Sequence, residues 1–166
     1  MAITNHLPFA MTLFSALGCG LIAGVFFAFS SFVMPALARL QAAQGIAAMQ
    51  SINITVINPL FMGAFLGTAA ACIYLTISSL LKWRQLGTTY LLVGSLLYLI
   101  GTFLVTIVFN VPLNDALAAV KPDSTDGANV WANYLVNWTF WNHIRTLAAL
   151  AATASFITAL CNRGGS

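Results

Sequence analysis

The chain has 166 residues, of which 60% are hydrophobic and only 5% are charged, and its formal net charge is +3. Because soluble domains carry roughly 25% charged residues, folding in water would leave one large apolar surface, which excludes a soluble globular domain. The six basic residues are dispersed along the chain, which excludes the clustered basic face that nucleic-acid binding requires.

Four long apolar runs follow one another, at about residues 9–34, 54–81, 88–109 and 139–161. Each run reaches the roughly 20 residues that a helix needs to cross the hydrocarbon core of a bilayer. Because lipid offers the backbone no hydrogen-bond partners, each run must be helical. The sequence therefore predicts an all-α, integral membrane four-helix bundle in which residues 1–166 form a single transmembrane domain.

Two segments between the runs differ from them. Residues 36–52 alternate apolar side chains with arginine and glutamine, which predicts a short helix lying at the membrane interface. Residues 110–137 form the longest polar stretch, and Pro112, Pro122 and Gly127 within it are typical of turns. We expect this stretch to be an extramembrane loop that caps the bundle.

Two further patterns concern orientation and packing. Lys82 and Arg84 lie between the second and third runs, and Arg163 follows the fourth. Since basic residues concentrate in cytoplasmic loops, the N- and C-termini are both predicted to be cytoplasmic. Small residues at four-residue spacing predict close contacts between helices; they are Ala16, Gly20, Gly24 and Ala28, then Gly63, Gly67 and Ala71, then Ala151, Ser155 and Ala159.

Polar side chains gather at one end of the predicted bundle. Such residues are costly at membrane depth and are typical of functional sites. Because consecutive helices alternate in direction, the start of the second run, the end of the third and the start of the fourth lie on the same side. These ends carry Asn53 and Asn58, then Asn110 and Asn114, then Thr139, Asn142, His143 and Arg145. In the third run, Tyr98, Thr102 and Thr106 lead to Asn110 in four-residue steps, which predicts a polar stripe facing the bundle interior.

Residues 138–146 are the densest part of this polar end, and each has two interpretations. Trp138 and Trp141 belong either to an interfacial aromatic belt or to a binding site. Arg145 either extends outward to the headgroups or donates its planar guanidinium to a ligand oxyanion. His143 is either a structural hydrogen-bonding residue or a base that titrates near neutrality. Since His143 and Arg145 are two residues apart, they point to nearly opposite sides of their helix.

Ligands for a metal or haem are scarce. His6 and His143 belong to opposite sides of the membrane, and one histidine among asparagines is a poor zinc or copper site. The apolar runs hold no carboxylate of the kind that proton-coupled transport uses. We therefore expect no metal and no protein-held cofactor.

An ordered set of short motifs runs over nearly the whole chain. It comprises residues 23–30, Met34-Pro35-Ala36-Leu37, Met49-Gln50, Ile52-Asn53, Asn58-Pro59-Leu60-Phe61, Asn110-Val111-Pro112-Leu113-Asn114, Trp138, and Trp141-Asn142-His143-Ile144-Arg145-Thr146. In this set the chain resembles the anthrone oxygenase-like family of small membrane proteins, also described as a domain of unknown function (DUF1772). The resemblance implies a four-helix membrane bundle, and for its characterised fungal members the oxidation of anthrones to anthraquinones by molecular oxygen without a bound cofactor.

Together with this resemblance, the polar residues suggest a hypothesis for the reaction mechanism. An aromatic or polyketide-like substrate with an acidic C–H bond enters from the bilayer, a base removes the proton, and hydrogen-bond donors stabilise the enolate oxygen, which then reacts directly with oxygen. The expected catalytic residues are His143 as the base, with Arg145 and Asn142. The expected substrate-binding residues are Asn53, Asn58, Asn110, Asn114, Phe26, Phe29, Trp138 and Trp141.

Two other functions fit the same residues. The first is a non-enzymatic membrane subunit, or a scaffold that binds lipid or quinone, for which the small-residue stripes would be sufficient. The second is a small-molecule transporter. The expected partners are membrane lipids and an apolar small molecule, together with either further copies of the chain or a larger membrane complex.

Overall fold

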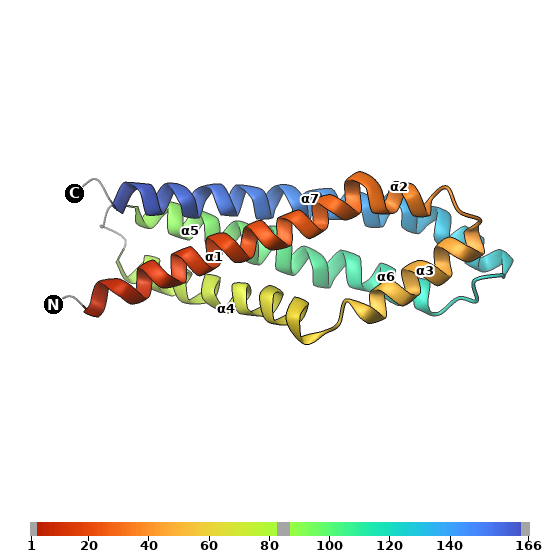
Figure 1. Ribbon diagram of the computed structural model, residues 1–166, viewed down its shortest axis with the longest axis horizontal. Helices are drawn as coiled ribbons and strands as arrows, with labels where there is room; N and C mark the ends of the chain where they lie inside the picture. Colours follow the sequence, from red (N-terminus) through yellow and green to blue (C-terminus); the bar gives the residue numbers. More distant parts are fainter. Residues whose placement is uncertain (1–2, 83–86, 164–166) are drawn as a thin grey trace.

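The computed structural model describes residues 3–82 and 87–163, and these residues form four helical rods packed side by side (Figure 1). The η segments below are π-helical and continue the rods in which they lie. The first rod is α1 (Ile3–Ala28), η1 (Phe29–Val33) and α2 (Met34–Leu37), and the second is α3 (Ala42–Thr55) followed by α4 (Pro59–Leu81). The third is α5 (Thr88–Leu96), η2 (Leu97–Leu104), η3 (Thr106–Asn110) and α6 (Val111–Ala118), and the fourth is α7 (Thr125–Arg163).

Four stretches of these rods are long and apolar enough to cross a bilayer: Leu7–Leu37, Pro59–Leu81, Thr88–Ala118 and Thr125–Asn162. No strand occurs among the described residues. The predicted all-α, four-span class is therefore confirmed, and the chain has the architecture of a multi-pass integral membrane protein. The beginning of α1 and the end of α7 lie at the same end of the bundle (Figure 1).

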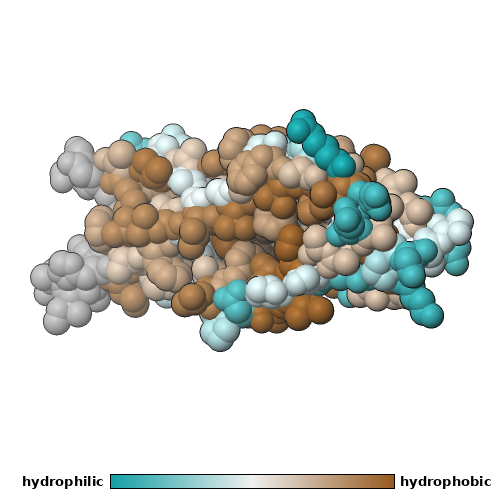
Figure 2. Space-filling view, turned by 45° about the vertical axis from the view of Figure 1, so that its right-hand side comes forward, coloured by the Kyte–Doolittle hydropathy of each residue, from teal (hydrophilic) through white to brown (hydrophobic). Residues whose placement is uncertain are grey.

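The rods extend beyond the hydrocarbon core at the opposite end. The 39 residues of α7 span about 58 Å at 1.5 Å per residue, whereas the hydrocarbon core is about 30 Å thick. Figure 2 shows hydrophilic residues gathered at the end formed by α3, α6 and the beginning of α7, and hydrophobic residues over most of the remaining visible surface. The polar end predicted from the sequence is thus one physical end of the molecule.

Two prolines, Pro35 and Pro112, lie where a helical rod continues, although Pro112 was expected to mark a turn. Proline clashes with the carbonyl group one helical turn earlier and lacks the amide donor of a regular helix. Pro35 lies in the first turn of α2 directly after η1, and Pro112 lies in the first turn of α6 directly after η3. The wider π-helical turn leaves room for each proline ring, so the first and third rods continue past these positions.

The polar connection after the third span is therefore much shorter than expected. It covers residues 119–124, and the predicted extent of 110–137 was wrong. The beginning of α7 is stabilised by Trp131, Tyr134 and Trp138, which are buried at helical spacing in a second hydrophobic core. Polar side chains occupy the outer side of the same turns, which is why the segment resembles a loop in composition.

The separate helix expected after the first span is α3. It returns obliquely along α6 and α7 (Figure 1), and its Ile46 and Met49 are buried in the second core. The rod then breaks before Pro59. Asn58 caps α4 by accepting hydrogen bonds from the amides of Leu60 and Phe61, each at 3.1 Å, and proline suits the first helical position. This break lies beside the cavity described next.

Candidate functional site

Arg145 is a buried cation at the centre of the polar end. It lies on α7 with 4% of its surface exposed. Its Nη2 donates a hydrogen bond of 2.6 Å to Asn142 Oδ1, and its Nη1 donates one of 3.3 Å to Thr106 Oγ1. The guanidinium carbon lies 4.1 Å from the centre of the Phe26 ring and 5.1 Å from that of Trp138. Each of these contacts is with a neutral group, so the positive charge is held by amide, hydroxyl and aromatic partners.

Asn142 fixes the position of the guanidinium. The side chain is fully buried, and its Nδ2 donates to the Phe26 carbonyl oxygen at 2.7 Å and to Ser30 Oγ at 2.6 Å. Both acceptors belong to the first rod, at the junction of α1 and η1. With its nitrogen held by this rod, the amide oxygen of Asn142 must face Arg145.

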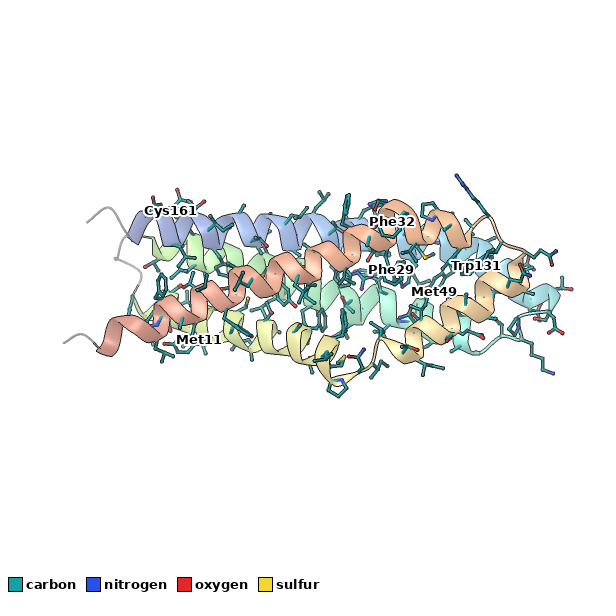
Figure 3. The ribbon with its side chains drawn as sticks, viewed as in Figure 1. Met11, Phe29, Phe32, Met49, Trp131 and Cys161 are labelled. Carbon is teal, nitrogen blue, oxygen red and sulfur yellow. The ribbon has the colours of Figure 1, made fainter. Side chains whose placement is uncertain are left out.

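A cavity of about 320 Å³ adjoins this cluster, a size near the lower end of the roughly 300–1,000 Å³ typical of small-molecule sites. We call it the aromatic cavity. Its wall is almost entirely apolar, with the side chains of Asn53, Thr106, Asn114 and Arg145 as the polar exceptions. It is lined by Val25, Phe26, Phe29, Met49, Ile52, Asn53, Val56, Ile57, Phe61, Met62, Phe65, Leu66, Phe103, Thr106, Ile107, Val111, Asn114, Trp138 and Arg145. In Figure 3, Phe29 from η1 and Met49 from α3 lie in this part of the bundle.

Two residues of this wall each carry a buried hydrogen-bond donor that has no partner. The Nε of Arg145 and the indole Nε1 of Trp138 are both buried and unpaired. A buried donor without a partner costs about 1–3 kcal/mol. Both residues line the same cavity. An oxygen atom of a bound molecule could therefore accept a hydrogen bond that no group of the protein accepts.

A second cavity of about 640 Å³, the polar vestibule, adjoins the first. Gln50, Asn53, Asn114 and Asp115 contribute polar groups, and Ile54, Ile57, Val111 and Ala118 complete the lining. Asn53, Ile57, Val111 and Asn114 belong to both cavities. Asn114 is oriented by the Tyr134 hydroxyl, which donates to its Oδ1 at 2.8 Å. The two spaces thus share a wall containing two asparagines.

Six residues proposed from the sequence line the aromatic cavity, namely Phe26, Phe29, Asn53, Asn114, Trp138 and Arg145. Asn142 lies behind Arg145 and positions it. The polar stripe of the third rod also faces inward: Tyr98 donates to the Phe65 carbonyl at 3.0 Å, and Thr102 donates to the Arg145 carbonyl at 3.3 Å. The structure therefore brings together most of the residues that the sequence connected.

Four proposed residues lie elsewhere. His143 is exposed on the outer side of α7 and does not line the cavity, as the two-residue spacing from Arg145 anticipates. Trp141 stacks on Phe109 with ring centres 3.6 Å apart, away from the cavity wall. Asn58 uses its side chain to cap α4, and Asn110 donates to the Trp138 carbonyl at 3.2 Å. A catalytic role for His143 and binding roles for the other three stay predictions, and the geometry gives them no support.

Several residues of the site were not proposed from the sequence. Ser30 orients Asn142, Thr106 binds Arg145, and Phe61, Phe65 and Phe103 supply aromatic wall. Phe61 and Phe65 are one turn apart on α4 and stack with ring centres 5.9 Å apart, a spacing that could have indicated a shared face. Ser30 has no comparable signal, because its role depends on a contact across 112 positions of the chain.

Among the described residues, no group of three or more His, Cys, Asp or Glu side chains is placed to hold a metal ion. A family model described as anthrone oxygenase matches residues 56–155 of the chain. No curated protein and no solved structure matches the chain. The matched segment runs from the α3–α4 break into α7 and contains Thr106, Trp138, Asn142 and Arg145. Because this match covers more than half of the sequence, the chain belongs to the anthrone oxygenase family.

Proposed function

We propose that this protein uses molecular oxygen to oxidise an apolar, fused-ring aromatic molecule that carries an acidic C–H bond conjugated with a carbonyl group. The observation that carries the proposal is that two residues lining the aromatic cavity, Arg145 and Trp138, each carry a buried donor without a partner, at Nε and Nε1. Membership of the anthrone oxygenase family supports the same chemistry. A substrate carbonyl oxygen that comes within reach of either donor would accept a hydrogen bond that the folded chain leaves unmade.

Arg145 acts on the charge that develops when the substrate loses its proton. Deprotonation places negative charge on the carbonyl oxygen of the resulting enolate, and a guanidinium binds such an oxyanion more strongly than it binds the neutral ketone. The apolar wall strengthens this preference, because charges interact more strongly where water is excluded. Asn142 and Thr106 hold the guanidinium in place before the reaction, so little reorganisation is needed.

The enolate supplies the electrons for the oxidation. Electron transfer to oxygen followed by C–O bond formation gives a hydroperoxide at the former C–H carbon. Loss of water from this hydroperoxide leaves a second carbonyl group. One oxygen atom thus enters the product and the other leaves as water, and the substrate itself supplies the electrons, so this route has oxygen as co-substrate and requires no bound cofactor.

The released proton needs an acceptor. His143 was the expected base, but its position on the outer side of α7 gives it no path to the cavity wall. We assign proton removal to water that reaches the substrate past Asn53 and Asn114, the asparagines shared with the polar vestibule. A weak base is sufficient if Arg145 makes the bound substrate more acidic.

We also propose that the vestibule opens on the non-cytoplasmic side. Lys82 follows α4 at the opposite end of the bundle, where α1 begins and α7 ends. Basic residues favour the cytoplasmic side, so the chain ends would be cytoplasmic.

Oxygen uptake by the purified protein with a simple anthrone tests the function. The expected result is one oxygen molecule consumed for each anthraquinone formed, at a rate that a metal chelator leaves unchanged. Arg145→Met should lower the uptake by roughly 10²- to 10³-fold, and an Asn137→Ala variant, altered at an exposed position of the same helix, should retain it. Uptake no faster than autoxidation of anthrone in protein-free detergent would contradict the proposal and favour a binding or scaffold role.

A further inference from the structure

Two residues that line the aromatic cavity, Leu66 and Ile107, are also exposed on apolar membrane-spanning segments. We propose that the substrate reaches the cavity sideways from the bilayer, between α4 and η3, and that the polar vestibule is not its route. The identity of the ligand rests on the proposed function, whereas the access path does not. A lipid-facing path would favour substrates dissolved in the membrane over substrates dissolved in water.

The rim of the opening consists of residues that face two ways. Leu66 on α4 and Ile107 on η3 both line the aromatic cavity, yet 46% and 48% of their surfaces are exposed. Both residues belong to candidate membrane spans. Each side chain borders the cavity and is also nearly half exposed, so the proposed mouth lies between these two residues.

The position of Leu66 along α4 places this mouth within the hydrocarbon layer. The 23 residues of α4 span about 34 Å, close to the thickness of a hydrocarbon core, so Pro59 lies near one boundary. Leu66 is seven residues further on, or about 10 Å deeper. Its neighbours on the rim are apolar, and an aromatic molecule passing between them exchanges lipid contacts for similar protein contacts.

The vestibule is a poor route for the same molecule. Its lining includes the polar residues Gln50, Asn53, Asn114 and Asp115. An aromatic ring could pass them only by displacing the water that hydrates their polar groups, which costs free energy. Ile57, which is 72% exposed and lies at the α3–α4 break, lines both the vestibule and the aromatic cavity. The two openings therefore have different roles in the proposal. The aromatic substrate enters through the lipid-facing opening, and water and protons pass through the polar vestibule.

Blocking each opening in turn tests this division. Ile107→Cys and Ala118→Cys are made separately in a Cys161→Ser background, because Cys161 is exposed whereas Cys19 and Cys72 are buried. Ala118 lines the vestibule alone, and Ile107 lines the aromatic cavity alone. Each variant is reconstituted in phosphatidylcholine vesicles and labelled with a bulky maleimide. The unlabelled form of each variant is its own control for correct folding.

The readout is binding and does not depend on turnover. Anthracene, an apolar three-ring probe, is supplied in a second set of vesicles, and energy transfer from tryptophan to anthracene is recorded. The chain has four tryptophans, so the part of the transfer that a matched Trp138→Phe variant lacks reports the arrival of the probe beside Trp138. Labelling at position 107 should slow the approach to equilibrium by about tenfold or more, because access then requires a conformational change. Labelling at position 118 should leave the rate unchanged.

Three results would overturn the proposal: slowing by the label at position 118 alone, equal slowing by both labels, or slowing by neither. A Leu66→Cys variant repeats the test on the other side of the rim if labelling at position 107 proves incomplete. Anthracene binding that depends on the rim, in a protein that consumes no oxygen with anthrone, would refute the proposed oxidation and leave the access route standing.

Discussion

Arg145 and Asn142 lie one turn apart on α7 and are joined by a hydrogen bond of 2.6 Å, yet the two residues have different surroundings. Arg145 lines the aromatic cavity, whereas Asn142 is fully buried behind it and is bonded to the first rod. One residue is therefore placed to contact a ligand, and the other positions it. Substitutions at the two sites should have different consequences.

Loss of the Arg145 guanidinium should remove most of the activity. Deleting a donor that stabilises a developing oxyanion typically lowers kcat by roughly 10²- to 10³-fold, and we expect Arg145→Met to fall in this range. Arg145→Lys keeps the charge but lacks the planar set of donors, so it should retain an intermediate rate. Oxygen uptake at saturating anthrone measures both variants. A methionine variant with nearly normal kcat would show that the charge is not used in the reaction.

Replacement of Asn142 should affect stability as well as rate. Asn142→Ala leaves the Phe26 carbonyl without this side-chain donor and removes the main support of the guanidinium, at a cost of about 1–3 kcal/mol for a buried group left unpaired. We expect a lower Tm in detergent and a reduced kcat with little change in KM. Asn137→Ala, at an exposed position of α7, is the matched control and should leave Tm unchanged.

The sequence and the structure lead to different expectations for a variant of His143. If it were the base, His143→Ala would abolish oxygen uptake. Because the residue is exposed on the outer side of α7, we expect the variant to keep a rate similar to that of the wild type. Uptake measured between pH 5 and 9 for both proteins decides the matter. A rate lost in the variant alone would restore histidine to the mechanism and remove our assignment of proton transfer to water.

The sequence predicted the class of fold and the end of the bundle that holds the site, because apolar length and alternating helix direction determine both. It overestimated the polar connection after the third span, since the buried residues Trp131, Tyr134 and Trp138 are separated by polar residues on the outer side of α7. It grouped Arg145 with Asn142, and the two side chains are hydrogen-bonded in the structure. It placed His143 and Arg145 on nearly opposite sides of their helix, but it could not tell which side faces the interior, because that depends on how neighbouring rods pack.

The same limit applies to the small-residue stripes. Gly24 belongs to a predicted stripe, yet a Cβ added there would meet nothing within 4 Å. Gly101 belongs to no stripe, yet its Cβ would lie 2.5 Å from the Cβ of Ala148, where the third rod meets α7. Spacing identifies residues that permit close approach, but only the packed structure identifies where the approach occurs.

These glycines give a test of the packing. Gly101→Ala should destabilise the bundle by about 1–3 kcal/mol, because neither the backbone of η2 nor the Ala148 methyl group can move aside without shifting a helix. Gly24→Ala should leave the stability unchanged or slightly higher. Thermal unfolding in one detergent compares the two variants. Equal Tm values would contradict the close contact between η2 and α7.

The central claim is that the cavity binds the enolate of its substrate more strongly than the ketone. The most direct measurement is an anaerobic titration of anthrone with the protein, in which the absorbance of the enolate is followed against pH. Wild-type protein should lower the pKa of bound anthrone, Trp138→Phe should lower it less, and Arg145→Met should leave it at the value in empty detergent micelles. An unchanged titration in all three proteins would contradict the account.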